Sequence, residues 1–167
     1  MKIKAINHYL KALMLVAQVS DISSPNVVVQ PMDPLLDKAI KIIKQKEPNA
    51  FSGVSTINVG TGSGSLGFVE SGPGKDPTVV NIDAGLIKNK ASQFDPNTAD
   101  FLNGLPNPEE AKKVFWTTVT LYHEIAHVKD FDEKSGFPGG EGVAESAERD
   151  IINWMKSNIS SIQYLFQ

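Results

Sequence analysis

The sequence of 167 residues contains no cysteine. This absence excludes a disulfide framework, a zinc site made of thiolates and a cysteine nucleophile. It does not decide the compartment, because cytosolic and exported proteins can both lack cysteine. The localisation is therefore unknown from the sequence, and both the cytoplasm and export as an effector remain open.

Long apolar runs are also absent. No stretch approaches the ~20 residues that an α-helix needs to span a bilayer, so we expect no membrane span. Lysines precede the short apolar stretch Ala12–Ala17, but a secretory signal would need a longer apolar segment and a small-x-small cleavage site. A core-facing amphipathic helix is predicted instead, because apolar residues recur there at helical spacing. These residues are Ile3, Ile6, Leu10, Leu13, Met14 and Ala17.

Positive charge is dispersed along the chain. The formal net charge is −3, and Arg149 is the only arginine. The lysines are scattered and fit solvated helix faces, whereas phosphate binding needs clustered cations, so we expect no nucleic-acid partner. Arg149 could bind a substrate carboxylate in a bidentate manner or form a salt bridge with Glu145 or Asp150.

The length of the chain predicts one domain, residues 1–167, with room for one sizeable core. Two helix starts are marked by a polar cap followed by proline, at Asp33-Pro34 and Asn107-Pro108. The second of these helices should run without a breaker to about Lys129. A closing helix is expected from about Glu141.

The middle of the chain has strand character. Short β-branched or alternating runs, divided by glycine and proline, occupy Val54–Val59, Ser65–Glu70 and Thr78–Ala84. They predict about three strands in a small, mostly antiparallel sheet, and hence an α+β domain. Gly60–Ser65 lacks the lysine of a phosphate loop and opens no helix, so a hairpin turn is the favoured interpretation. Lys88–Asn107 has few periodic features and predicts an ordered loop.

An HExxH motif, His123-Glu124-Ile125-Ala126-His127, lies inside the helix predicted from Pro108. Residues four apart share a helical face, so both imidazoles can point at one zinc ion at ~2.0–2.1 Å. Glu124 is rotated about the axis and can reach a water in the fourth coordination position. Zinc lowers the pKa of such a water to about 7. A carboxylate base can then take a proton from this water, which leaves hydroxide to attack a carbonyl, and later pass the proton to the leaving amine.

The same motif would also fit an amphipathic helix whose histidines make ordinary hydrogen bonds. Three observations favour a metal site. The chain has only three histidines, and two of them lie in the motif. The motif lies on a predicted helix, as the geometry requires, and acidic residues follow on a second helix. The third histidine, His8, is expected at or near the surface and not as a ligand.

A third protein ligand must come from outside the motif, and two arrangements are open. In one, the chain turns sharply and Glu133 closes the site. That turn usually has a glycine three residues beyond the second histidine, where this chain has Asp130, and only glycine enters the required backbone region cheaply. In the other, an acid on the next helix closes the site, and three acids share one face there: Glu141, Glu145 and Glu148.

Gly140-Glu141-Gly142-Val143-Ala144-Glu145 resembles the gluzincin metallopeptidases, which include the thermolysin-like enzymes. Their motif is a histidine pair followed by a glutamate, two further residues and a small residue, a pattern that Glu141–Ala144 fits. The resemblance covers about His123–Asp150 and implies a zincin-like fold, a zinc cofactor and Glu141 as third ligand. In thermolysin-like members an acid four residues beyond the ligand orients the first histidine, which implies that role for Glu145. Glu145 also remains the alternative third ligand.

Together these features predict a zinc metallopeptidase that hydrolyses peptide bonds. His123, His127 and Glu141 would bind Zn²⁺, and Glu124 would be the general base acting on a peptide or protein substrate. A glycine/serine turn, a strand ending near Ile82-Asp83 and the motif helix are similar to compact metallopeptidase domains of bacterial effectors and toxins. The oligomeric state is not indicated.

Two other classes of function remain open. The chain could be a zinc-binding structural or interaction module without protease activity, or a metal-dependent hydrolase of a non-peptide amide. Tyr122 and Tyr164 could donate to a developing oxyanion, although packing aromatics are the simpler interpretation.

Overall fold

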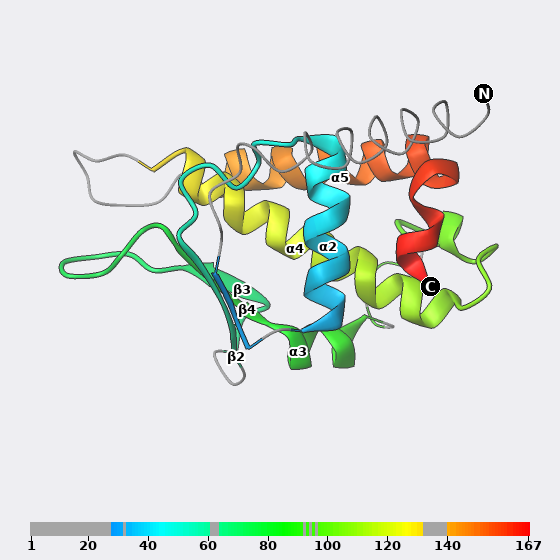
Figure 1. Ribbon diagram of the computed structural model, residues 1–167, viewed down its shortest axis with the longest axis horizontal. Helices are drawn as coiled ribbons and strands as arrows, with labels where there is room; N and C mark the ends of the chain where they lie inside the picture. The colour runs from blue at the N-terminus through cyan, green and yellow to red at the C-terminus, as the bar shows by residue number, and fades with distance from the viewer. Residues whose placement is uncertain are drawn as a thin grey trace, which may run out of the picture.

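The computed structural model of the protein describes residues 28–31, 33–60, 64–91, 93, 95, 97–131 and 140–167. The predicted N-terminal helix with His8, and Glu133, lie outside the described residues. The elements are β1 (Val28–Gln30), α2 (Pro34–Lys46), β2 (Thr56–Gly60), β3 (Gly67–Val69), β4 (Val79–Asp83), α3 (Ala84–Lys90), η1 (Asp100–Leu102), α4 (Pro108–Lys129), α5 (Glu141–Ile162) and η2 (Gln163–Phe166) (Figure 1).

The strands form one mixed sheet in the order β1-β2-β4-β3. β2 runs parallel to both β1 and β4, and β3 runs antiparallel to β4. The architecture is therefore α+β as predicted, but the prediction of a mostly antiparallel sheet is wrong. One reason is that α2 carries the chain back between β1 and β2, and such a helical crossover makes these two strands parallel. The other is that β3 lies between β2 and β4 in the chain but at the edge of the sheet, so that β2 and β4 pair with each other and run in the same direction.

Gly60–Ser65 does not connect paired strands. β4 lies between β2 and β3, so that Val80 has Ile57 as its neighbour on one side and Val69 on the other. The prediction of a hairpin turn between the first two strands is therefore wrong. The chain instead passes from β2 to the far side of β4, and this places β3 at the edge of the sheet.

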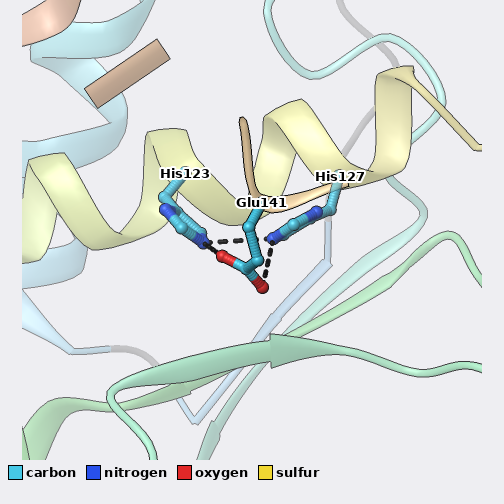
Figure 2. A group of neighbouring side chains, drawn as sticks. All are labelled: His123, His127 and Glu141. Atoms are coloured by element: carbon cyan, nitrogen blue, oxygen red, sulfur yellow. Dashed lines mark hydrogen bonds and ion pairs between the residues drawn. The ribbon is translucent and has the colours of Figure 1, made fainter. Parts of the chain in front are cut away.

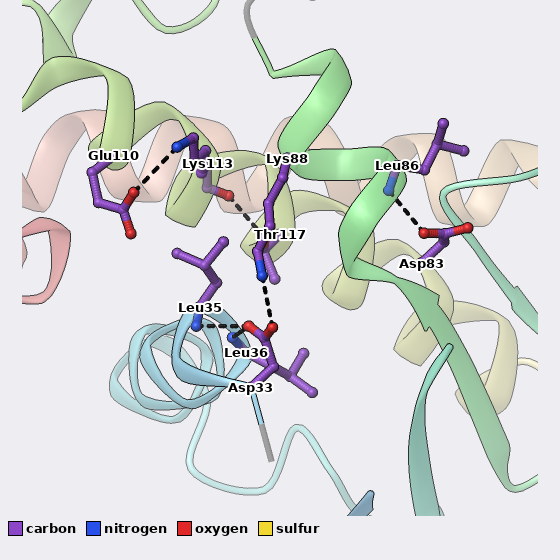
Figure 3. Close-up of polar contacts among 9 residues, drawn as sticks. All are labelled: Asp33, Leu35, Leu36, Asp83, Leu86, Lys88, Glu110, Lys113 and Thr117. Carbon is purple, nitrogen blue, oxygen red and sulfur yellow. Dashed lines mark hydrogen bonds and ion pairs between the residues drawn. The ribbon is translucent and has the colours of Figure 1, made fainter. Parts of the chain in front are cut away.

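Both predicted helix starts are confirmed. The carboxylate of Asp33 accepts the backbone N–H groups of Leu35 and Leu36 at the start of α2 (Figure 3). The side-chain oxygen of Asn107 accepts the N–H of Glu110 at the start of α4. Each cap satisfies N–H groups that have no partner within the helix.

The segment predicted as a loop, Lys88–Asn107, is partly helical. α3 extends to Lys90, and η1 lies further along the segment. α3 begins directly after β4 because the carboxylate of Asp83 accepts the N–H of Leu86 (Figure 3). Lys88 on α3 also forms an ion pair with Asp33, which connects α3 to the start of α2.

α4 is the central helix of the structure. It packs against α2 and α5, and it also contacts β3 and β4 of the sheet (Figure 1). Its buried side chains join a hydrophobic core that includes Ile57, Val80 and Ile82 from the strands. Burial of each such side chain contributes roughly 1.5–3 kcal/mol, so the helix that carries the HExxH motif is fixed between the sheet and the other helices. No helix in the described ranges is both long enough and apolar enough to cross a membrane.

Candidate metal centre

His123 and His127 lie on successive turns of α4 and point to the same side of the helix (Figure 2). Their Nε2 atoms are 3.1 Å apart. The opposite side of these turns carries Leu121 and Ile125, which are fully buried in the core. The backbone beneath the two imidazoles is therefore held by packing, and the rings converge as the four-residue spacing predicts.

Glu141, the first residue of α5, reaches both imidazoles (Figure 2). Its Oε2 lies 3.5 Å from Nε2 of His123, and its Oε1 lies 3.7 Å from Nε2 of His127. Donor atoms around a tetrahedral zinc ion, at bond lengths of ~2.0–2.1 Å, lie ~3.3 Å from one another. Two imidazole nitrogens and a carboxylate oxygen are thus brought to about the spacing that one such ion requires, and all are donors that zinc accepts.

One side of this group of donors is open to solvent. The side chain of Glu141 is 76% exposed, whereas that of His127 is 9% exposed. Three protein ligands leave the fourth position of a tetrahedral ion free, as in catalytic zinc sites. The two imidazoles are therefore largely covered by the protein, whereas the side of the group that carries the Glu141 carboxylate is accessible to a small molecule.

Glu148, two turns along α5, holds the ring of His123. Its Oε1 lies 2.8 Å from Nδ1 of His123. This hydrogen bond raises the pKa of His123 against the opposing effect of burial, and the negative charges of Glu124 and Glu141 act in the same direction. In the neutral ring it places the proton on Nδ1, which leaves the Nε2 lone pair directed at the other donors.

Glu145, to which the resemblance gave the orienting role, lies elsewhere. Its carboxylate is 62% exposed and is 3.9 Å from the guanidinium of Arg149. The geometry of a helix explains the difference: seven residues return to within about 20° of the starting direction, whereas four residues overshoot by about 40°. Glu148 therefore shares the face of Glu141 more closely than Glu145 does, and the structure brings Glu141 and not Glu145 to the two histidines.

Glu124 is buried on the sheet side of α4. Only 5% of the residue is exposed, and its side chain packs against the backbone of Gly67 in β3. Burial raises the pKa of the Glu124 carboxyl to about 7; the charges of Glu141 and Glu148 add to this effect, and His123 opposes it. A carboxyl group with this pKa can accept and release a proton near neutral pH.

Both tyrosines weighed as oxyanion donors have their hydroxyls at the C-terminal end of α2. The hydroxyl of Tyr122 donates to Oε2 of Glu47 at 2.8 Å, and the hydroxyl of Tyr164 accepts from Gln45 at 2.8 Å. Burial, together with the Glu47 carboxylate, raises the pKa of Tyr122. Tyr122 therefore fastens α4 to α2 immediately before the motif.

Two residues at the site were not assigned their roles from the sequence. The sequence indicates Glu148 only as a rival ligand, although its seven-residue spacing from Glu141 places the two acids on nearly the same face of a helix. Nothing in the sequence indicates a role for Gly67, because its contact with Glu124 depends on how β3 lies against α4.

Comparison with known proteins adds nothing to these assignments: no family model, curated protein or solved structure matches the chain.

Proposed function

We propose that this protein is a zinc-dependent metallopeptidase with a zincin-like, gluzincin-type site. One observation carries the proposal: donor atoms of His123, His127 and Glu141 converge at separations suited to a single tetrahedral zinc ion. These three residues would hold the ion. Glu124, buried beside the first histidine, would be the general base.

The chemistry divides between the metal and Glu124. Bound zinc supplies Lewis acidity, which lowers the pKa of a coordinated water to about 7 and polarises a substrate carbonyl. Glu124 accepts the proton of the attacking water and then donates it to the nitrogen of the leaving amine as the C–N bond breaks. The raised pKa of Glu124, about 7 in the metal-free protein, suits both steps.

The substrate would lie along β3. This strand is at the edge of the sheet and contacts α4. An extended peptide can add to such an edge through main-chain hydrogen bonds. Since Gly67 of β3 packs against Glu124, a peptide bound there would pass close to the base and to the open side of the three donors.

Metal content and cleavage test the proposal together. The wild type should bind stoichiometric zinc, and His127→Ala and Glu141→Ala should lose most of it. The wild type should cleave members of a broad peptide library, lose that activity with a chelator and regain it with added zinc. Wild-type protein that binds no zinc contradicts the proposal. Bound zinc without cleavage supports a non-proteolytic module, and cleavage confined to small non-peptide amides supports an amide hydrolase.

A further inference from the structure

Gly67, the first residue of β3, faces the helical side of the sheet. It is paired with Ile82 of β4, and residues directly opposite each other in a sheet project to the same face. Ile82 is 1% exposed and belongs to the core beneath α4. A side chain at position 67 would therefore project toward α4 and the motif.

The space that such a side chain would need is filled by Glu124. A β-carbon at position 67 would lie 2.8 Å from Oε1, 2.9 Å from Cγ and 3.1 Å from Cδ of Glu124. Non-bonded carbon atoms are best separated by about 3.5–4.0 Å. The three nearest atoms all belong to this one side chain, and the residue is only 5% exposed. An added methyl group would have to displace the carboxylate or separate β3 from α4.

Backbone conformation does not explain a glycine at this position. Positive φ angles occur at Gly53, Gly64, Gly72 and Gly74, but not at Gly67. Alanine could adopt the backbone of Gly67 without strain. The atoms that a side chain at position 67 would meet first are those of Glu124.

We propose that Gly67 is a positioning residue for Glu124. Because it has no side chain, β3 closes directly on the Glu124 side chain and fixes the carboxylate where it can accept the proton of the attacking water. Gly67 acts only through Glu124, within the proposed peptidase function on which this inference rests. Proton transfer requires a donor–acceptor separation of about 2.6–3.2 Å, so a small displacement of the carboxylate would slow the reaction while the three ligands stay in place.

The kinetic test compares Gly67→Ala with Gly60→Ala. Gly60 is a matched control, because it ends β2, has no positive φ and has no atom within 4 Å of a built β-carbon. A quenched fluorogenic peptide selected with the wild type is the substrate. Gly67→Ala should lower kcat on the order of 100-fold, with KM and zinc affinity close to wild type. Gly60→Ala should leave kcat, KM and zinc affinity unchanged.

A double-mutant cycle, measured by thermal unfolding, tests the contact between Gly67 and Glu124 without any substrate. In the metal-free protein, Gly67→Ala should lower Tm by about 5 °C in the wild-type background, which corresponds to ordinary overpacking of a core. In the Glu124→Ala background the same substitution should leave Tm unchanged, since the clashing atoms are gone. The double variant also keeps the test valid if Gly67→Ala alone fails to fold.

The outcomes separate the two proposals. Wild-type kcat in Gly67→Ala, or an equal loss of Tm in both backgrounds, overturns the positioning role. If the wild type cleaves no peptide, the proposed function fails. The Tm values of the double-mutant cycle still decide whether Gly67 fixes the Glu124 side chain.

Discussion

Nδ1 of His123 lies 2.8 Å from a carboxylate oxygen of Glu148. α5 therefore contributes two residues to the candidate metal centre. Glu141 lies near Nε2 of the first histidine at the open side of the donors, and Glu148 binds Nδ1 of the same ring. A hydrogen bond of this kind fixes the ring orientation and the tautomer of a metal-binding histidine. The position of α5 against α4 thus determines both which carboxylate joins the two histidines and which ring orientation and tautomer His123 adopts.

Substitution of Glu148 should weaken zinc binding without removing a ligand. Glu148→Ala frees the Nδ1 of His123, so the affinity for zinc should fall about 10–100-fold, as measured by competition with a chromophoric chelator. Glu145→Ala is the matched control, because Glu145 is exposed and forms an ion pair with Arg149; the zinc affinity of this variant should equal that of the wild type. A larger loss in Glu145→Ala than in Glu148→Ala would return the orienting role to Glu145.

Glu124→Gln should retain zinc and lose turnover. Glutamine has nearly the same shape, so the packing against Gly67 is kept, but the amide cannot accept the proton of the attacking water. Turnover of the selected fluorogenic peptide should fall by about 10²–10⁴-fold, with zinc content and Tm in the presence of zinc near those of the wild type. Full activity in Glu124→Gln would refute the role of general base.

The local features of the fold could be predicted from the sequence because their causes are local. The caps at Asp33 and Asn107 are each followed by proline, and the structure places both helix starts there. The convergence of His123 and His127 follows from their spacing on a helix. These features depend on residues that are three or four positions apart.

The features that could not be predicted depend on contacts between distant segments. Nothing in the short apolar run of β4 indicates that it inserts between β2 and β3, so the strand order and the parallel pairing were missed. The side-chain partner of His123 required the rotation of α5 relative to α4. The place of Gly67 against Glu124 required the position of β3, which the chain reaches only after it has crossed the end of β4.

Zinc should stabilise the folded protein, because its donors come from two helices that separate on unfolding. At a free zinc concentration of 100 times Kd, binding stabilises a folded protein by ~2.7 kcal/mol, which for a chain of this size should raise Tm by roughly 5–10 °C. Differential scanning fluorimetry of chelator-treated protein, with and without zinc, measures the shift. His127→Ala should show little or no shift, and an undiminished one in that variant would place the ion elsewhere.

Tyr122→Phe separates a structural role from a catalytic one. The hydroxyl of Tyr122 donates to Glu47, which also pairs with Lys129. Loss of this charged hydrogen bond should lower the free energy of unfolding by about 1–3 kcal/mol, measured by urea denaturation, while kcat on the fluorogenic peptide stays at the wild-type value. A large fall in kcat with unchanged stability would instead indicate that the hydroxyl acts on the oxyanion.

The buried carboxyl of Glu124 should make the stability of the metal-free protein depend on pH. Burial raises its pKa from 4.5 to about 7 in the folded chain, so between these two values the folded state holds a proton that the unfolded state has released. Stability contributed by Glu124 is therefore fully present below pH 4.5, declines as pH rises and is lost above about pH 7. Glu124→Gln has no such proton to lose.

The difference in free energy of unfolding between Glu124→Gln and the wild type should thus increase in favour of the variant from pH 4.5 to 7. The increase should be about 3 kcal/mol, since each unit of pKa corresponds to about 1.4 kcal/mol, and it should level off above pH 7. Urea denaturation of both chelator-treated proteins across this range measures it. Added zinc should reduce the effect, because a positive ion beside the carboxylate favours its ionised form. A difference that does not vary with pH would show that the Glu124 carboxyl titrates normally.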